Sequence, residues 1–408
     1  MKTILVSLVV AACAACCIAE GEQSAQPDAH RMPKEAAMRR RMPPPGMGRG
    51  MRARPFGKLS DGREAKIWRI TSPGGLVMDF TDYGGRLVRA YAPDRHGNLA
   101  DVTMGWNTAE EYEKYGFSAG TIIGRFGNRI KDGKFTLDGV EYQLPVNEDG
   151  KGRHCNLHSG PDGWDTKIWD ARPFRKGPVQ GIEFTYVSAD GEMGFPGKVE
   201  AKVTYSVAPD NSWRIDYEAT TDKPTVVNLT HHSYWNLAGE ASGDVLGQEL
   251  QIFADSYTQT DGGLIPTTDA SVEGTGFDFR TPRAIGAMAD WMKAQDALKP
   301  MDNWYDHNFV LRGKSGEMKK CVFMRDPVSG RTLEITTTEP CMQMYGAQNV
   351  TTELPAKAAG KTLCQFCAIA LETQHYPDSP NRPDFPSTVL RPGETYRSTT
   401  IYRFGVSK

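Results

Sequence analysis

Two adjacent histidines, His231 and His232, stand in the segment TVVNLTHHSYWNLAG (residues 225–239), between a β-branched apolar run and a Tyr-Trp-Asn cluster. An unperturbed histidine has a pKa of about 6.5, so its ring can donate or accept a proton near neutral pH. Consecutive side chains of an extended strand point to opposite faces, so only one of the two rings can face a given site. The segment therefore predicts either one proton-transfer histidine with a packing neighbour, or two ordinary polar residues at a strand end.

Four further polar clusters could complete a site. Asn128 and Arg129 belong to the turn GRFGNRI, which lacks the spacing of a phosphate-binding loop. His158 precedes a glycine-rich turn, Asp306 adjoins a histidine and an amide, and Glu372 follows the apolar strand AIAL. Each has a structural explanation on its own, because a strand-end Glu is commonly solvated and Asp306 can cap a turn. Together they supply acid/base groups and donors that suit the hydroxyl groups of a sugar.

Aromatic residues near these clusters extend the sugar hypothesis. We expect the apolar face of a sugar ring to pack on tryptophan, and four lie close in sequence, namely Trp164, Trp169, Trp235 and Trp304. The chain has no H-E-x-x-H or dinucleotide motif. The combination predicts proton transfer with no cofactor and no metal.

Composition narrows the class of protein. The 408 residues carry a formal net charge of -2, and this balance argues against nucleic acid as a partner. No apolar run beyond the N-terminal segment approaches the roughly 20 residues of a membrane span. The cysteines past that segment are odd in number and irregularly spaced, which does not indicate a disulfide scaffold. Cys364 and Cys367 fall in TLCQFCAIALE, which we expect to be a strand, so we interpret them as buried small hydrophobes.

The N-terminal region predicts export. Residues 1–19 combine Lys2, an apolar run and small residues near Ala19, which is a secretory signal pattern. Cleavage after Ala19 is one expectation, and lipid attachment at Cys13 is the alternative. Residues 20–55 are rich in Pro, Met, Gly and Arg without a stable period, and this predicts a flexible linker. We therefore expect an exported protein of a bacterial periplasm or cell envelope, either free or lipid-anchored.

The sequence of residues 56–408 predicts one β-rich domain. Asp138-Gly139 between two alternating runs predicts a hairpin with a two-residue turn. Helical signals are few, and the best helix candidates are 108–116 and 284–299. Many short strands joined by tight turns predict an all-β protein, a large antiparallel β-sandwich with few short helices.

Seven motifs of the chain resemble those of the aldose 1-epimerase (galactose mutarotase) family. In chain order they are GRFGNRI, NLHSG, VNLTHHSYWNLAG, ADSYTQTDGGLIPT, GTGFDF, YDHNFVL and LETQHYPDSPNRPDFPSTVLRPGETY. The resemblance implies a galactose mutarotase-like supersandwich with an open sugar cleft. It also implies a cofactor-free isomerase that interconverts the α and β anomers of free aldoses such as glucose and galactose. We expect a monomer whose only partner is a free monosaccharide, an aldohexose.

The resemblance further implies roles for single residues. Glu372 resembles the general base that takes the proton of the anomeric hydroxyl, and His232 resembles the acid that protonates the ring oxygen. His158 is similar to the histidine that assists at that oxygen, and Arg125 is expected to be structural. Substrate contacts are implied for Asn128, Arg129, Ser233, Tyr234, Asp306 and Gln343.

Two expectations about the resting site follow. The acid and the base should lie on opposite sides of the C1–O5 region, with Glu372 ionised and His232 protonated because each favours the charge of the other. His231 stands where the family usually has Asn, and by strand alternation it should face away from the site.

Two other functions stay open at this point. A glycoside hydrolase would use Asp306 and Glu372 as its carboxylate pair, about 5–5.5 Å apart if retaining or about 6.5–9.5 Å if inverting. A non-catalytic carbohydrate-binding protein is the second alternative, and the presence of Glu372, His158 and His232 counts against it. The mutarotase hypothesis predicts that His232, and not a second carboxylate, faces Glu372.

Overall fold

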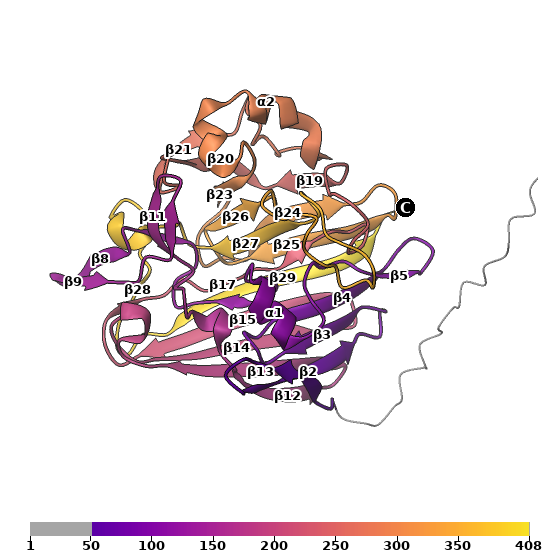
Figure 1. The fold of residues 1–408 in the computed structure, drawn as a ribbon, viewed down its shortest axis with the longest axis horizontal. Helices are drawn as coiled ribbons and strands as arrows, with labels where there is room; N and C mark the ends of the chain where they lie inside the picture. The colour runs from indigo at the N-terminus through magenta and orange to yellow at the C-terminus, as the bar shows by residue number, and fades with distance from the viewer. Residues whose placement is uncertain (1–50, 408) are drawn as a thin grey trace, which may run out of the picture. The chain divides into compact units, whose positions relative to one another are not determined.

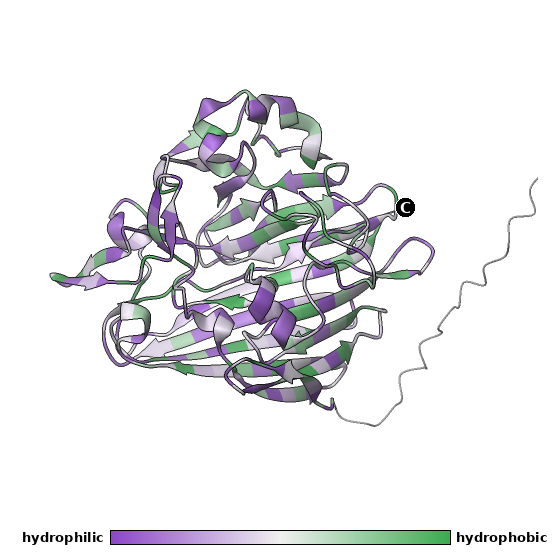
Figure 2. Cartoon of the chain, in the orientation of Figure 1, coloured by the Kyte–Doolittle hydropathy of each residue, from purple (hydrophilic) through white to green (hydrophobic). Residues whose placement is uncertain are grey.

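A nine-stranded antiparallel sheet is the largest element of the computed structural model, which describes residues 51–407 (Figure 1). Along its strands, side chains alternate between buried and more exposed, as in β14, where one face meets the core. Figure 2 shows the same alternation of hydrophilic and hydrophobic residues. In sheet order the strands are β12 (Asp170–Lys176), β13 (Val179–Ser188), β14 (Val199–Val207), β15 (Ser212–Thr221), β29 (Tyr396–Val406), β25 (Arg331–Thr337), β24 (Lys319–Arg325), β19 (Glu249–Ile252) and β22 (Arg283–Ala284).

Two further sheets pack on the nine-stranded one. The six-stranded sheet has the order β18 (Tyr234–Trp235), β27 (Ile369–Gln374), β26 (Cys341–Tyr345), β23 (Asp306–Leu311), β20 (Ala254–Thr260) and β21 (Pro266–Ser271). The five-stranded sheet comprises β1 (Arg54–Lys58), β2 (Glu64–Thr71), β3 (Val77–Thr81), β4 (Leu87–Pro93) and β5 (Leu99–Asp101). The predicted antiparallel β-sandwich is confirmed.

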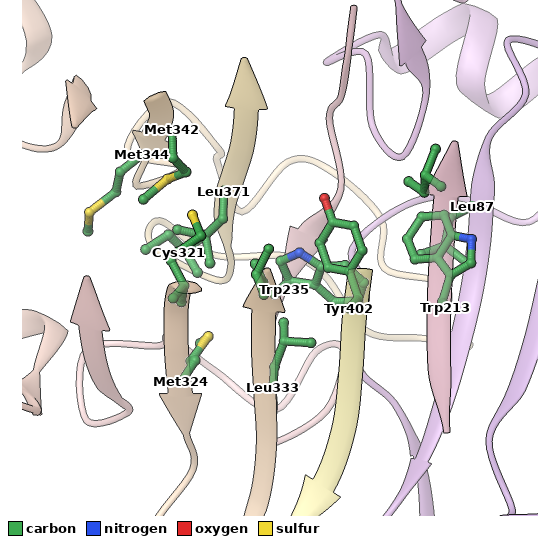
Figure 3. Packing of buried hydrophobic residues seen from close by; sticks show 14 of the residues in the cluster. Leu87, Trp213, Trp235, Cys321, Met324, Leu333, Met342, Met344, Leu371 and Tyr402 are labelled. Atoms are coloured by element: carbon green, nitrogen blue, oxygen red, sulfur yellow. The ribbon is translucent and has the colours of Figure 1, made fainter. Parts of the chain in front are cut away.

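Aromatic side chains fill the space between the sheets. The ring of Trp235 on β18 lies 5.4 Å from that of Tyr402 on β29, which joins the six-stranded sheet to the nine-stranded one (Figure 3). The ring of Phe80 on β3 lies 5.1 Å from Tyr205 on β14, which joins the five-stranded sheet to the same layer. Tyr402 also stacks on Trp213 at 4.9 Å. Each such ring removes a large apolar area from water, so these contacts fix how the sheets face one another.

Several short strand pairs lie outside the three large sheets. The predicted hairpin at Asp138-Gly139 is confirmed, because Leu137 pairs with Val140 across the turn. The short strands are β6 (Ile122–Ile123) with β17 (Thr230–His231), β16 (Thr225–Val226) with β28 (Val389–Leu390), β8 (Lys134–Leu137) with β9 (Val140–Gln143), and β10 (Glu148–Gly150) with β11 (Arg153–Leu157) and β7 (Arg129–Lys131).

Helices are few, and one helix prediction is wrong. The predicted helix at 108–116 appears as α1 (Ala109–Tyr115), capped by the Thr108 side chain. The predicted helix at 284–299 is broken into several pieces, because Ala284 pairs with Glu249 as part of strand β22 and Met288 has a non-helical backbone. The pieces are η3 (Ile285–Met288), α2 (Ala289–Lys293) and η4 (Asp296–Met301), and three further short 3-10 turns are η1 (Trp164–Thr166), η2 (Glu192–Gly194) and η5 (Ser379–Asn381).

The segment with two nearby cysteines also differs from its prediction. Strand β27 begins at Ile369, and the residues before it form a turn in which the Cys367 N–H donates to the Cys364 carbonyl at 3.1 Å. The turn requires a left-handed backbone at Phe366, with φ of 60°, which a strand cannot contain. All five described cysteines are free; Cys364 is half-buried and the others are buried.

No helix among residues 51–407 has the length and apolar character needed to cross a bilayer. The predicted leader (1–19) lies outside the described residues, as does all but the last five residues of the predicted linker (20–55). Export and lipid attachment at Cys13 therefore stay predictions.

A buried ion pair ties the end of β27 to the neighbouring strands. His375 Nδ1 lies 2.6 Å from Glu339 Oε2, and the Tyr396 hydroxyl donates to Glu339 Oε1 at 3.1 Å. Burial opposes both charges, but each partner outweighs it, so the pKa of Glu339 is lowered and the pKa of His375 is raised. The pair therefore stabilises the fold at intermediate pH. Its contribution is lost as the pH falls through the Glu339 pKa or rises through the His375 pKa.

We expect the substitution His375→Gln to lower the free energy of unfolding by about 3–5 kcal/mol, because it leaves Glu339 buried without its cation. Urea unfolding of both proteins between pH 5 and pH 9 measures this, and the difference between them should shrink as the pH rises through the His375 pKa. His96→Gln, at an exposed turn, is the control. An equal unfolding free energy for His375→Gln and wild type would contradict the expectation.

Candidate active site

Strand alternation gives the six-stranded sheet one polar face and one apolar face. Glu372 on β27 pairs with Gln343 on β26, and Gln343 pairs with Asn308 on β23. Asp306 shares the face of Asn308, because the two are two residues apart. His307, between them, turns to the core and packs 4.4 Å from the Phe277 ring. The motif Asp-His-Asn therefore contributes its carboxylate and amide to one face and its histidine to the other.

A pocket of about 210 Å³ opens on the polar face. It brings together eight of the nine residues that the sequence predicted, which come from segments far apart in the chain. They are Asn128, Arg129, His158, His232, Tyr234, Asp306, Gln343 and Glu372. The other lining residues are Phe117, Ser118, Glu148, Arg153, Leu157, Tyr345 and Asn349.

Ser233 is the predicted substrate contact that does not line this pocket. Its hydroxyl lies 2.8 Å from His231 Nδ1, and both side chains are buried on the core side. The His231 ring packs 5.0 Å from Trp213 and 5.7 Å from Tyr205, so it faces away from the site as predicted. The placement of Ser233 in the site was wrong, because a residue two positions from His231 shares its face.

His232 and Glu372 are side by side at the bottom of the pocket. His232 Nε2 lies 3.5 Å from Glu372 Oε1, and both side chains are almost fully buried. The backbone of His232 is fixed by its N–H, which donates to the Thr121 carbonyl at 2.9 Å, and by its carbonyl, which accepts from the Gly120 N–H at 2.8 Å. The predicted neighbour of Glu372 is thus a histidine, but the two groups adjoin and do not face one another across a gap.

The resting charges of this pair also differ from expectation. Burial lowers the pKa of His232 to about 4. Burial and the nearby charge of Asp306 raise the pKa of Glu372 well above its ordinary value, against the smaller opposing effect of Arg129. Loss of hydration therefore outweighs the attraction between the two groups. Without a sugar, a single proton shared by this pair therefore lies on Glu372 and not on His232.

His158 presents a fixed hydrogen-bond donor to the same place. Its Nδ1 accepts the N–H of Asn128 at 3.0 Å, so the neutral ring carries its proton on Nε2. Burial, His232 and Arg129 lower the pKa of His158 well below its ordinary value, and the ring stays neutral. One nitrogen or oxygen from each of His158, His232 and Glu372 lies within 4.8 Å of the others, close enough for a metal. A neutral ring that offers N–H suits an oxygen acceptor, whereas a metal requires a lone pair.

Charged residues form another part of the pocket wall. Asp306 uses both oxygens, since Oδ1 accepts from Gln343 Nε2 at 2.6 Å and Oδ2 accepts from Arg129 Nη2 at 3.3 Å. Arg129 also donates from Nε to Glu148 Oε2 at 2.6 Å, and Glu148 accepts from Arg153 at 2.6 Å. Arg125 lies outside the pocket, where its guanidinium donates to the Pro196 carbonyl at 2.8 Å.

Comparison of the sequence with known proteins assigns the chain to a family. The sequence profile of the aldose 1-epimerase family matches residues 66–403. The chain belongs to this family. It is 38% identical to the galactose mutarotase of Homo sapiens over 354 residues, which are 86% of this chain and 98% of the human protein. It is 35% identical to the aldose 1-epimerase of Escherichia coli over 347 residues, which are 84% of this chain and 96% of that protein.

A solved structure of a related protein supports the same family assignment. The chain superposes on the crystal structure of an aldose epimerase homologue from C. elegans with a TM-score of 0.74 and 29% sequence identity. The comparison covers 84% of this chain and 100% of that one. The predicted supersandwich and the predicted family are both confirmed.

The aromatic surface of this aldose 1-epimerase site is not the predicted one. The four tryptophans are buried in the core, and none lines the pocket. Phe117, Tyr234 and Tyr345 supply the apolar surface instead, and the Tyr234 ring stacks 4.8 Å from that of His232. Alternation could have found Tyr345, because it lies two residues from Gln343 on the same strand. No local signal marked Glu148 or Arg153.

Proposed function

We propose that this protein interconverts the α and β anomers of free aldoses, including glucose and galactose. The observation that carries the proposal is the contact between His232 and Glu372, which places one acid and one base within 3.5 Å at the bottom of a polar pocket. Anomer exchange needs two proton transfers at oxygens that are both bonded to C1, so an acid and a base that adjoin are suited to it. This replaces the expectation that they lie on opposite sides of the ring.

The reaction can be written so that every proton is accounted for. The Glu372 carboxylate takes the proton from the C1 hydroxyl, the C1–O1 bond becomes a carbonyl, and the C1–O5 bond breaks. The His232 imidazolium gives its proton to O5, and the His158 Nε2–H donates a hydrogen bond there. Rotation about C1–C2 turns the other face of the aldehyde to O5. The two proton transfers then run in reverse and close the ring as the other anomer.

During this cycle Glu372 and His232 exchange protons only with the sugar. The charged pair and the neutral pair of Glu372 and His232 hold the same number of protons, so moving between them requires no exchange with solvent. Burial favours the neutral pair, and the neutral pair is the one that accompanies the open-chain aldehyde. Bound hydroxyl groups would supply hydrogen bonds for the charged pair at the start of the cycle.

The two alternatives have less support. In a hydrolase, Asp306 would need a free carboxylate oxygen for the glycosidic bond or for water, but both of its oxygens are held by Gln343 and Arg129. In a binding protein, nothing would require a buried acid and base to adjoin at a net cost of burial.

Polarimetry tests the proposed activity directly. Freshly dissolved α-glucose or α-galactose should reach its equilibrium rotation faster when the protein is present, at a rate proportional to protein concentration. Glycosides of the same sugars, which lack a free C1 hydroxyl, should stay unchanged. An equilibration rate equal to that of the buffer for every aldose tried would overturn the proposal.

A further inference from the structure

Arg129 is held on one side by Glu148, a residue outside the motifs that predicted the site. Its Nε donates to Glu148 Oε2 at 2.6 Å, and its Nη2 donates to Glu148 Oε1 at 3.2 Å, so the carboxylate meets the guanidinium edge with both oxygens. Nη2 also donates to Asp306 Oδ2 at 3.3 Å. Two of the three guanidinium nitrogens are therefore occupied, and Nη1 is left for a ligand in the pocket that Arg129 lines.

The small sheet β10-β11-β7 explains why these groups meet. Glu148 pairs with Cys155, and Arg129 pairs with Leu157, so their side chains project from one face of this sheet. Arg153 shares that face and donates from Nη1 to Glu148 Oε1 at 2.6 Å. The charges alternate along the wall from Asp306 to Arg153, as a buried set of charges requires if each is to be compensated.

Arg153, the last residue in this series of alternating charges, also contacts the short helix η4. Arg153 Nη2 donates to the Pro300 carbonyl of η4 at 2.7 Å. Burial alone would raise the pKa of Glu148, but the charges and hydrogen bonds of Arg129 and Arg153 outweigh it and lower that pKa to about 2. At neutral pH Glu148 is therefore an anion, and it holds Arg129 by two charge-assisted hydrogen bonds.

We propose that Glu148 is a positioning residue for sugar binding: by holding Nε and Nη2 of Arg129 against the wall, it aims Nη1 at the hydroxyl groups of the sugar. The inference rests on the proposed function and extends it to a residue that does not touch the reacting atoms. A bidentate carboxylate fixes the plane of a guanidinium as well as its position. Without Glu148, Arg129 keeps its charge and its contact with Asp306 but can rotate.

The substitution Glu148→Gln tests this, because it keeps the size of the side chain and removes the paired acceptors. We expect kcat/KM for α-glucose or α-galactose to fall by about 10- to 100-fold, mainly through KM, as for a displaced binding group. Glu141→Gln, on the exposed hairpin strand β9, is the matched control and should leave both constants unchanged. If Glu148→Gln does not fold, Glu148→Asp, which withdraws the carboxylate by one methylene, should show the same loss in KM.

A double-mutant cycle with Arg129→Lys separates positioning from general support of the fold. Lysine cannot make the bidentate contact, so Glu148→Gln should change kcat/KM by less than about twofold in that background. An equal loss in both backgrounds, or a wild-type KM for Glu148→Gln, would overturn the inference while wild-type activity still upheld the proposed function. A wild-type protein without activity on any aldose would overturn both.

Discussion

The substitution Glu372→Gln is expected to reduce anomer exchange by about 10²–10⁴-fold, the contribution of a positioned proton-transfer group. The amide keeps the shape of the side chain but cannot take the proton of the C1 hydroxyl. The loss should appear in kcat as well as in kcat/KM, because the missing step is chemical and the pocket stays intact. Polarimetry of freshly dissolved α-glucose or α-galactose at several substrate concentrations measures both constants.

Stability separates this result from a folding defect. Glu372 Oε2 is buried without a hydrogen-bond partner, so the carboxyl costs free energy in the folded state. The thermal unfolding midpoint of Glu372→Gln should therefore equal or exceed that of wild type. Glu183→Gln, on strand β13, should keep wild-type kinetics. A Glu372→Gln protein that folds and retains the full rate would show that another group is the base.

Strand alternation explains why so much of the site could be predicted from the sequence. Around the two histidines it assigns His232 and Tyr234 to one side and His231, Ser233 and Trp235 to the other, and the structure follows this division. Of the two misplaced residues, Ser233 was implied by the family resemblance and Trp235 by its proximity in sequence, and neither ground carries information about the face. A consistent use of the two-residue period would have corrected both.

The rest of the site depends on contacts that no local pattern encodes. Glu148 meets Arg129 only because β11 pairs with both β10 and β7, and this pairing is a property of the tertiary fold. The charge state of the acid/base pair is non-local in the same way. Attraction between Glu372 and His232 predicts an ion pair, but the depth at which the sheets bury both groups reverses the balance.

The segment 284–299 shows a related limit for secondary structure. Its helical period is real, and α2 forms in the middle of it. The start of the segment is taken by strand β22, since Ala284 completes the edge of the nine-stranded sheet beside Glu249. Tertiary pairing therefore overrides a local preference worth well under 1 kcal/mol per residue.

The substitution His232→Asn is expected to reduce kcat/KM by about 10²–10⁴-fold, because asparagine cannot give a proton to O5. His158 cannot replace it, since its Nδ1 is committed to the Asn128 N–H and its low pKa keeps the ring neutral. His96→Asn, at an exposed turn, is the control that should retain wild-type rates.

The pH dependence of wild-type kcat/KM tests the same assignment, because this constant reports the free enzyme. With a His232 pKa of about 4 and a Glu372 pKa well above its ordinary value, the single-proton pair persists from about pH 4 to the raised Glu372 pKa. Below that range the pair gains a second proton and loses its base; above it the pair loses its only proton and has no acid. Activity should therefore be level across the range and fall at both ends, as a property of the coupled pair. Circular dichroism at each pH confirms that the protein is folded, and an activity that stays level well below pH 4 would show that this pair does not carry the proton transfers.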